Sequence, residues 1–387
     1  MNIPITTTDR FTAEGDPAVE QAIADMLRRL ADDIRRLADS DRVAIYLGGA
    51  YGRGEGGVLV TQDGHHLPYN DLDFFAFSKG LSSARRKAFD GKLAEIAPAY
   101  ERMSGVSVDF APVKKLEKLR CERHTLMYQE LLNSHRLVCG PDLLAEVPCP
   151  DAHDLPYLEA LRLLVNRGMG LLFSTQRLSA AHVDDSGRPV DDEVADFAIR
   201  NLHKAALGAG DALLIAQKRY DYNLERRLKI IMYDAHATGV FTELAPFYQA
   251  ARDFKALPGS QRMNPLEKLP DYLELWLNAT RNFVALTTDR SATVLETTRQ
   301  MSECLYGHPA FIGRSPMVNA LRWFVKTRTA SPLRLLFKNP TVRLFTRLHE
   351  TLQDVRQNLA NGQPLAQAFG KMDEHRQELV RLWEIFN

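Results

Sequence analysis

The chain has 387 residues, 45% of them hydrophobic and 25% charged, a composition typical of a globular protein with a large buried core. Its 49 basic and 49 acidic side chains cancel, so net charge alone indicates neither a nucleic-acid nor a membrane partner. The four cysteines are widely spaced, which argues against a disulfide framework or a zinc site. The N-terminus lacks a secretion signal, and no run of about 18 apolar residues predicts a transmembrane helix, so we expect a cytoplasmic protein.

The first part of the chain has the pattern of a small α/β domain. Apolar residues at helical spacing predict an amphipathic helix over about residues 16–40 and a second helix over 82–100. Short apolar runs predict buried strands over residues 43–47 and 72–77. Alternating apolar and polar residues predict a further strand over 106–110. This order of elements indicates a mixed sheet.

A cluster of prolines near residue 150 indicates a domain boundary. We therefore expect a mixed-sheet domain over 1–150, a helical domain over 151–300 and a basic helical region over 301–387. Helical periodicity covers residues 158–178, 194–219, 224–237, 265–286 and 335–359. Gly208 and Gly210 lie inside one of these helices, where they indicate close packing or a bend. The predicted fold class is α+β, with an N-terminal mixed sheet and a largely helical remainder.

Residues 47–57, LGGAYGRGEGG, directly follow the first predicted strand. Gly48 and Gly49 have no Cβ, so their backbone can approach phosphate oxygens closely. Arg53 fits two roles in this loop: contact with a triphosphate, or an ion pair with Glu55 that orders the loop. Tyr51 likewise fits either stacking on a base or packing in the core.

Three aspartates lie on the predicted strands that follow. Asp71 and Asp73 are two positions apart and therefore project from the same face of their strand. Asp109 shares the polar face of a later strand with Ser107. Three carboxylates converging across adjacent strands would form a site suited to Mg²⁺ or Mn²⁺. Two such ions can bridge a triphosphate and an attacking hydroxyl.

These motifs resemble the DNA polymerase beta-like nucleotidyltransferase superfamily. The resemblance rests on Gly48 and Gly49 after an apolar strand, on Asp71 and Asp73 in an Asp-x-Asp pair, and on Asp109 as a third acid. It covers about residues 43–112 and implies a palm-like catalytic domain. In such a domain the first two acids bind both metal ions and the third helps to activate the acceptor hydroxyl.

The function that this resemblance implies is transfer of an NMP from an NTP to a hydroxyl acceptor, with release of pyrophosphate. ATP is the expected donor by analogy. The acceptor stays open between a small hydroxylated molecule, a protein side chain and an RNA end. A helical domain beside this fold often supplies a cation that holds the triphosphate, and Lys204 is our candidate, with a solvated lysine as the alternative. A catalytically inactive nucleotide- or RNA-binding module of the same fold is the alternative function.

One spacing differs from the family pattern. Asp71 follows Gly49 by 22 positions (71 − 49), which is longer than usual in the family. The additional residues contain a turn motif at Asp63 and Gly64 between apolar positions. We interpret them as a β-hairpin inserted beside the site.

A basic segment lies in the last third of the chain. Residues 304–349 contain no acid and carry eight cations interleaved with aromatic residues: Arg314, Arg322, Lys326, Arg328, Arg334, Lys338, Arg343 and Arg347, with Trp323, Phe324, Phe337 and Phe345. Such a segment suits nucleic-acid phosphates, an anionic membrane surface or an acidic acceptor. It also suits ordinary helices whose aromatics face the core and whose cations face water.

Overall fold

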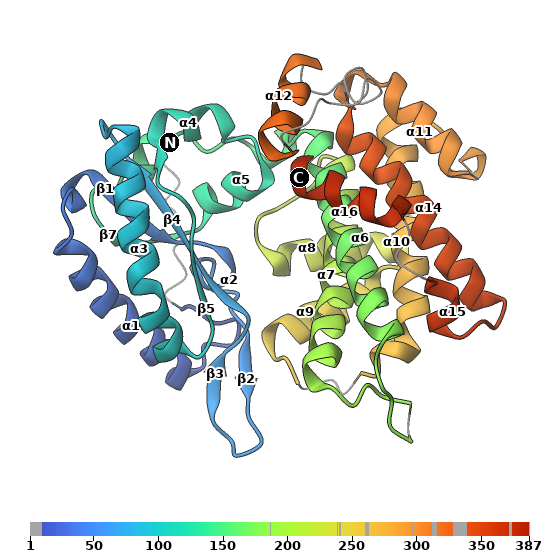
Figure 1. The fold of residues 1–387 in the computed structure, drawn as a ribbon, viewed down its shortest axis with the longest axis horizontal. Coiled ribbons are helices and arrows are strands. Elements are labelled where there is room, and N and C mark those ends of the chain that lie inside the picture. Colours follow the sequence, from blue (N-terminus) through green and yellow to red (C-terminus); the bar gives the residue numbers. More distant parts are fainter. Residues whose placement is uncertain are drawn as a thin grey trace. The chain divides into compact units, whose positions relative to one another are not determined.

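A computed structural model of the protein describes residues 10–185, 187–237, 239, 241–259, 263–295, 297–311, 316–327, 339–370 and 374–386. The chain divides into two compact units (Figure 1). The first contains Met1–Leu155, Asp221–Arg226 and Arg252–Arg262, and the second contains the other segments. The predicted α+β class is confirmed, because a mixed sheet occupies the N-terminal region and the remainder is mostly helical. The division of the helical remainder near residue 300 stays a prediction.

The first unit is built on a five-stranded mixed sheet. Its strands are β1 (Val43–Leu47), β4 (Asp71–Ser78), β5 (Ser107–Phe110), β6 (Lys114–Lys115) and β7 (Arg136–Cys139). The order is β5-β4-β1-β7, and β6 pairs with the far end of β4. Strand β1 is antiparallel to β4 and to β7, whereas β5 and β6 are parallel to β4.

The connections in this unit include a hairpin and five helices. The hairpin strands are β2 (Val58–Val60) and β3 (His66–Pro68), and the helices are α1 (Pro17–Arg35), α2 (Gly49–Gly52), α3 (Ser83–Ser104), α4 (Leu116–Glu122) and α5 (Leu126–Asn133). Helix α1 begins where the Asp16 carboxylate accepts hydrogen bonds from the backbone N–H groups of Ala18 and Val19. Helix α3 ends at Gly105, whose φ of 74° suits glycine. The predicted hairpin is confirmed, since β2 and β3 pair antiparallel around residues 61–65.

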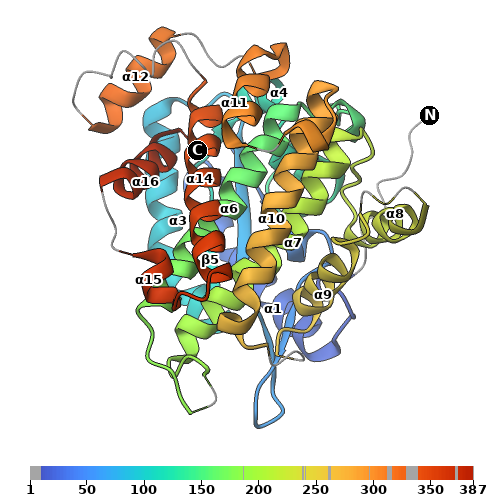
Figure 2. The ribbon, with the colours of Figure 1, turned by 90° about the vertical axis from the view of Figure 1, so that its right-hand side faces the viewer.

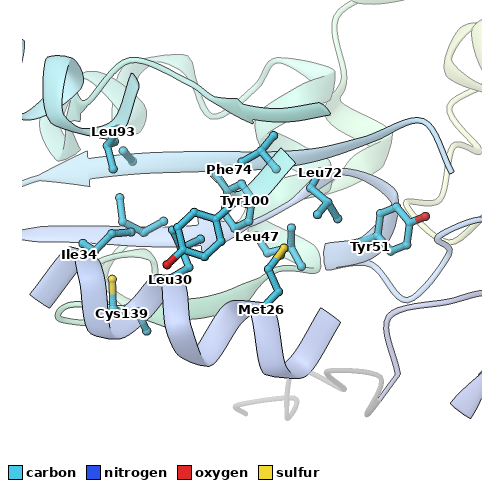
Figure 3. Packing of buried hydrophobic residues seen from close by; sticks show 14 of the residues in the cluster. Met26, Leu30, Ile34, Leu47, Tyr51, Leu72, Phe74, Leu93, Tyr100 and Cys139 are labelled. Carbon is cyan, nitrogen blue, oxygen red and sulfur yellow. The ribbon is translucent and has the colours of Figure 1, made fainter. Parts of the chain in front are cut away.

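Side chains alternate between the two faces of the sheet. Leu72 and Phe74 of β4 lie in a core cluster with residues of α1 and α3 (Figure 3). Tyr46 of β1 and Phe77 of β4 lie in a second cluster with residues of α4 and α5. Both faces are therefore apolar along most of the sheet, which explains why β1 reads as a continuous apolar run.

The second unit is helical. Its elements are α6 (Tyr157–Ser179), α7 (Asp192–Ala216), α8 (Leu224–Ala237), α9 (Ala245–Ala256), α10 (Pro265–Thr288), α11 (Thr298–Gly307), α12 (Pro316–Thr327), α14 (Pro340–Ala360), α15 (Leu365–Phe369) and α16 (Glu374–Phe386). Helix α8 begins, and α9 ends, in segments assigned to the first unit. Short 3-10 helices cover Ser40–Arg42, Leu144–Glu146 and Ala152–Asp154 in the first unit, and Ala292–Val294 and Pro309–Phe311 in the second. Helices α6, α7, α10 and α14 pack around a common core (Figure 2).

Glycines let these helices approach closely. A Cβ on Gly210 would lie 2.5 Å from the ring of Tyr248, and one on Gly208 would lie 2.4 Å from Arg167 Cγ. The close packing predicted at these two glycines is confirmed. A Cβ on Gly168 would lie 2.6 Å from the ring of Trp276. In the described ranges, we find no helix with the length and apolarity that a bilayer crossing requires.

Candidate active site

Strands β4 and β5 bring the three predicted aspartates to one face of the sheet. Asp71 and Asp73 alternate with the buried Leu72, so both point away from the core that Leu72 fills. Asp109 of β5 is the parallel partner of Asp73, and Ser107 is the partner of Asp71. Residues paired in this way lie side by side, at the spacing of about 4.8 Å between neighbouring strands.

The apolar partners of the same strands fix this orientation. Phe74 of β4 and Phe110 of β5 stack with ring centroids 4.9 Å apart on the opposite face. A shift of either strand by one residue would bury an aspartate and expose a phenylalanine. The alternation therefore holds Asp71 and Asp73 half-buried and leaves Asp109 exposed.

Gly48 and Gly49 form the turn after β1, directly against Asp73. The backbone N–H of Gly48 donates to the carbonyl oxygen of Asp73 at 2.9 Å. Gly49 has a φ of +58°, and a Cβ at this position would lie 2.1 Å from Asp73 Oδ2. A Cβ on Gly48 would lie 2.6 Å from the ring of Phe75. Both positions thus favour glycine, because a Cβ would displace the ring of Phe75 or the carboxylate of Asp73.

Two polar neighbours contact the carboxylates. Asn70, in the left-handed region with φ of 80°, donates from Nδ2 to Asp71 Oδ1. Ser107 donates from Oγ to Asp109 Oδ2 at 3.3 Å. Asn70 was not among the residues predicted for the site, although its position directly before Asp71 could have indicated a contact with that carboxylate.

An ionic network that includes Arg53 fixes the glycine loop, residues 47–57. Arg53 contacts Glu55 through Nε at 3.2 Å and Glu130 of α5 through Nη1 at 2.9 Å, and its side chain is 12% exposed. Glu55 also accepts from Lys255 Nζ at 2.7 Å and from the backbone N–H of Leu224 at 2.9 Å. Of the two roles considered for Arg53, the ion pair with Glu55 is the one present. Glu130 and Lys255 carried no indication in the sequence.

Tyr51 packs in the core of the first unit. Its ring is 1% exposed, and its hydroxyl donates to the carbonyl oxygen of Gly57 at 2.6 Å and accepts from the backbone N–H of Tyr69 at 2.7 Å. Burial raises the pKa of the Tyr51 hydroxyl above its ordinary value. Stacking of this ring on a base is excluded in this arrangement, because no face of the ring is accessible.

Two other predicted features lie in the second unit. Lys204 is half-buried on α7, and its role as a cation for the triphosphate stays a prediction. In the basic segment, Arg343 and Arg347 contact Glu378 at 3.5 and 2.6 Å, and Phe345 is buried in the core. Five other members of that segment lie outside the described residues: Arg314, Arg328, Arg334, Phe337 and Lys338.

The carboxylates on β4 and β5 are of the chemical type that binds hard divalent cations. Three carboxylates on one face match the oxygen ligands that Mg²⁺ and Mn²⁺ prefer. Because Gly49 has no Cβ, the backbone of the loop lies directly against Asp73 Oδ2. In the described part of the chain, however, no three His, Cys, Asp or Glu side chains are grouped closely enough to hold an ion as they stand. The strand register places the three carboxylates on one face of the sheet, but they do not form a preformed coordination site.

Comparison of the chain with known protein families, with curated proteins and with solved structures finds no match.

Proposed function

We propose that the first unit is a palm-like nucleotidyltransferase domain that transfers an NMP from an NTP to a hydroxyl acceptor. The observation that carries this proposal is the placement of Asp71, Asp73 and Asp109 on one face of the sheet, beside the turn at Gly48 and Gly49. Residues that are far apart in the sequence meet there in the order that the superfamily motif requires. ATP is the donor that we propose, by analogy with that superfamily.

In this proposal the three carboxylates have two different roles, metal binding and proton acceptance. Asp71 and Asp73 would hold Mg²⁺, with Asn70 orienting the first of them. Mg²⁺, when bound, would neutralise charge on the triphosphate. The exposed Asp109 would accept the proton of the acceptor hydroxyl, with Ser107 holding its carboxylate.

At the α-phosphorus, the reaction would form one bond and break one, and one proton would be transferred. The acceptor oxygen would attack the α-phosphorus, and the bond from that phosphorus to the bridging oxygen of the β-phosphate would break. Pyrophosphate leaves with the electron pair, and the hydroxyl proton passes to Asp109. The protein would contribute mainly position and charge neutralisation.

The ionic network around the glycine loop supports a positioning role for Arg53. Because Arg53 contacts Glu55 and Glu130, its charge is already balanced. We therefore propose that Arg53 holds the loop against β4, while Gly48 and Gly49 give the nucleotide access to the carboxylates.

The test is label transfer from each α-labelled NTP by the purified full chain with Mg²⁺. Pools of RNA, protein extract and small hydroxylated molecules serve as acceptors. We expect transfer with pyrophosphate release, and a loss of at least about hundredfold in Asp71→Ala/Asp73→Ala. Asp63→Ala, at the exposed hairpin tip, is the matched control and should keep the wild-type rate.

Other outcomes would separate the alternatives. Binding of an NTP without turnover, abolished in the double variant, would support the inactive nucleotide-binding module. If no NTP is bound or consumed with Mg²⁺ or Mn²⁺, both readings of the site are wrong.

A further inference from the structure

Helix α12 presents an apolar face to solvent. Met317, Leu321, Phe324 and Val325 are each between 50% and 83% exposed. Their spacing of four, three and one positions places them on one side of the helix. Exposed apolar side chains that form a contiguous stripe, rather than isolated positions, mark an interaction surface.

The other side of α12 is anchored. Trp323 is 7% exposed, and its ring stacks on Phe386 of α16 with centroids 6.5 Å apart. The Arg381 guanidinium of α16 lies 6.0 Å from the Trp323 ring. Helix α12 is therefore held beside α16, at a distance from the core of α6, α7 and α10 (Figure 2). The apolar stripe faces outward while the anchoring tryptophan faces inward.

The charge around this stripe is mainly positive: Arg322 and Lys326 of α12 and Arg381 of α16 stand against the exposed Glu384 of α16. Lys326 is exposed at the end of α12, and the sequence contains no acidic residue between Glu303 and Glu350. Glu378 does reach this part of the chain, but it is engaged with Arg343 and Arg347. Apolar side chains beside an excess of cations complement a lipid surface, whose acyl chains are apolar and whose headgroups are anionic.

The outward side chains favour lipid over nucleic acid. A groove for RNA presents cations to phosphates and aromatic rings to bases. On α12 the outward side chains are mainly aliphatic, with Phe324 as the exposed ring. A helix of 12 residues is about 18 Å long, which suits an orientation in the plane of a membrane surface.

We propose that α12 binds an anionic lipid surface, with Met317, Leu321, Phe324 and Val325 inserted among the acyl chains and Lys326 at the headgroups. This surface is independent of the carboxylates on β4 and β5. It would bring the second unit to a membrane surface.

The test is co-sedimentation of the full chain with vesicles of phosphatidylcholine alone, or of phosphatidylcholine and phosphatidylglycerol in equal amounts. We expect binding to the anionic vesicles that weakens as salt rises. Leu321→Asp/Phe324→Asp should bind at least about tenfold more weakly, because it removes apolar contact and adds repulsion. Lys326→Gln should bind about fivefold more weakly through loss of one charge.

The matched control is Val183→Asp/Val190→Asp, which makes the same chemical change at two exposed valines between α6 and α7. Circular dichroism checks that all variants fold. The control should bind as the wild type does. Equal binding by Leu321→Asp/Phe324→Asp, or no binding of the wild type to either vesicle, overturns the proposal.

Two further measurements identify other occupants. Binding of single-stranded polyuridylate without vesicle binding would assign the face to nucleic acid and overturn the lipid proposal. Self-association in sedimentation experiments that Leu321→Asp/Phe324→Asp abolishes, again without vesicle binding, would assign it to a second copy. Neither outcome bears on nucleotide transfer, which the label assay measures separately.

Discussion

Gly49 lies where the backbone of the loop touches a carboxylate of the candidate site. Its positive φ and the 2.1 Å approach of a hypothetical Cβ to Asp73 Oδ2 are two separate reasons for glycine. We expect Gly49→Ala to lower the free energy of unfolding by about 3 kcal/mol, from backbone strain and overpacking together. Chemical denaturation measures this loss.

Gly64 offers a control that separates the two causes. It has a φ of +81° at the hairpin tip, and nothing lies within 4 Å of a hypothetical Cβ. Gly64→Ala should therefore cost only the backbone strain, about 1 kcal/mol. Equal losses in the two variants would show that the contact with Asp73 contributes nothing.

Asp109 is the exposed member of the three aspartates, so its role can be tested with little effect on folding. We expect Asp109→Asn to lower label transfer by at least about hundredfold. The free energy of unfolding should change by less than about 0.5 kcal/mol, since the side chain is exposed. Ser107→Ala, which removes only the 3.3 Å hydrogen bond to Asp109, is the milder comparison. A fully active Asp109→Asn enzyme would remove this residue from the mechanism.

At the scale of elements, Glu55 ties the glycine loop to two distant segments. Its carboxylate is 11% exposed and contacts Arg53, Lys255 and the backbone N–H of Leu224. We expect Glu55→Ala to lower the free energy of unfolding by about 2–3 kcal/mol, because the groups that it contacts are left in a largely buried place. Urea denaturation of the full chain gives the value.

Glu95 provides the comparison for this loss. It pairs with Lys92 at 2.7 Å on α3, with both side chains more than half exposed. Glu95→Ala should change the free energy of unfolding by less than about 0.5 kcal/mol. A loss in Glu55→Ala as small as this one would mean that the network does not fix the loop.

The elements also show where local patterns were insufficient. The helices over residues 224–237 and 265–286 were predicted from apolar periodicity, and α8 and α10 occupy almost the same positions. Helices α4 and α5 and strand β7 were not predicted. All three are short: α4 and α5 are stabilised by packing against the second face of the sheet, and β7 by pairing with β1, more than by their own periodicity. The predicted helix over 335–359 begins in residues outside the described ranges, and α14 starts at Pro340.

At the scale of the whole molecule, two buried histidines make stability depend on pH. Burial lowers the pKa of His203 to about 4, and burial, with Arg281 nearby, lowers that of His349 to about 3. Their ordinary pKa is 6.5. The unfolded chain therefore binds protons that the folded chain does not as pH falls below 6.5. The stabilisation is complete above that pH and is lost on acidification toward the folded values.

We expect the free energy of unfolding to fall by up to about 1.4 kcal/mol per pH unit for each histidine between pH 6.5 and about 4. Tryptophan fluorescence reports this for the second unit, because Trp276, Trp323 and Trp383 all belong to it. His349→Gln should flatten the slope, whereas His65→Gln, at the exposed hairpin tip, should leave it unchanged. An unchanged slope in His349→Gln would exclude that residue as a cause.

The sequence by itself determined which residues share a face of a strand. Alternation in β4 and β5 placed Asp71, Asp73 and Asp109 opposite Leu72 and Phe74, and the Asp63–Gly64 turn indicated the hairpin. These features depend on neighbours within a few positions, so a local pattern is enough to specify them.

Only the tertiary structure decided what surrounds those residues. Glu130 and Lys255 reach the glycine loop from 77 and 200 positions away, and no local pattern encodes such contacts. In the same way, Phe345 packs in the core while Phe324 is exposed, although both belong to one basic and aromatic segment. The physical reason is that the periodicity of a strand or helix determines on which face each residue lies. The burial of that residue and its ionic partners depend instead on which distant elements pack against that face.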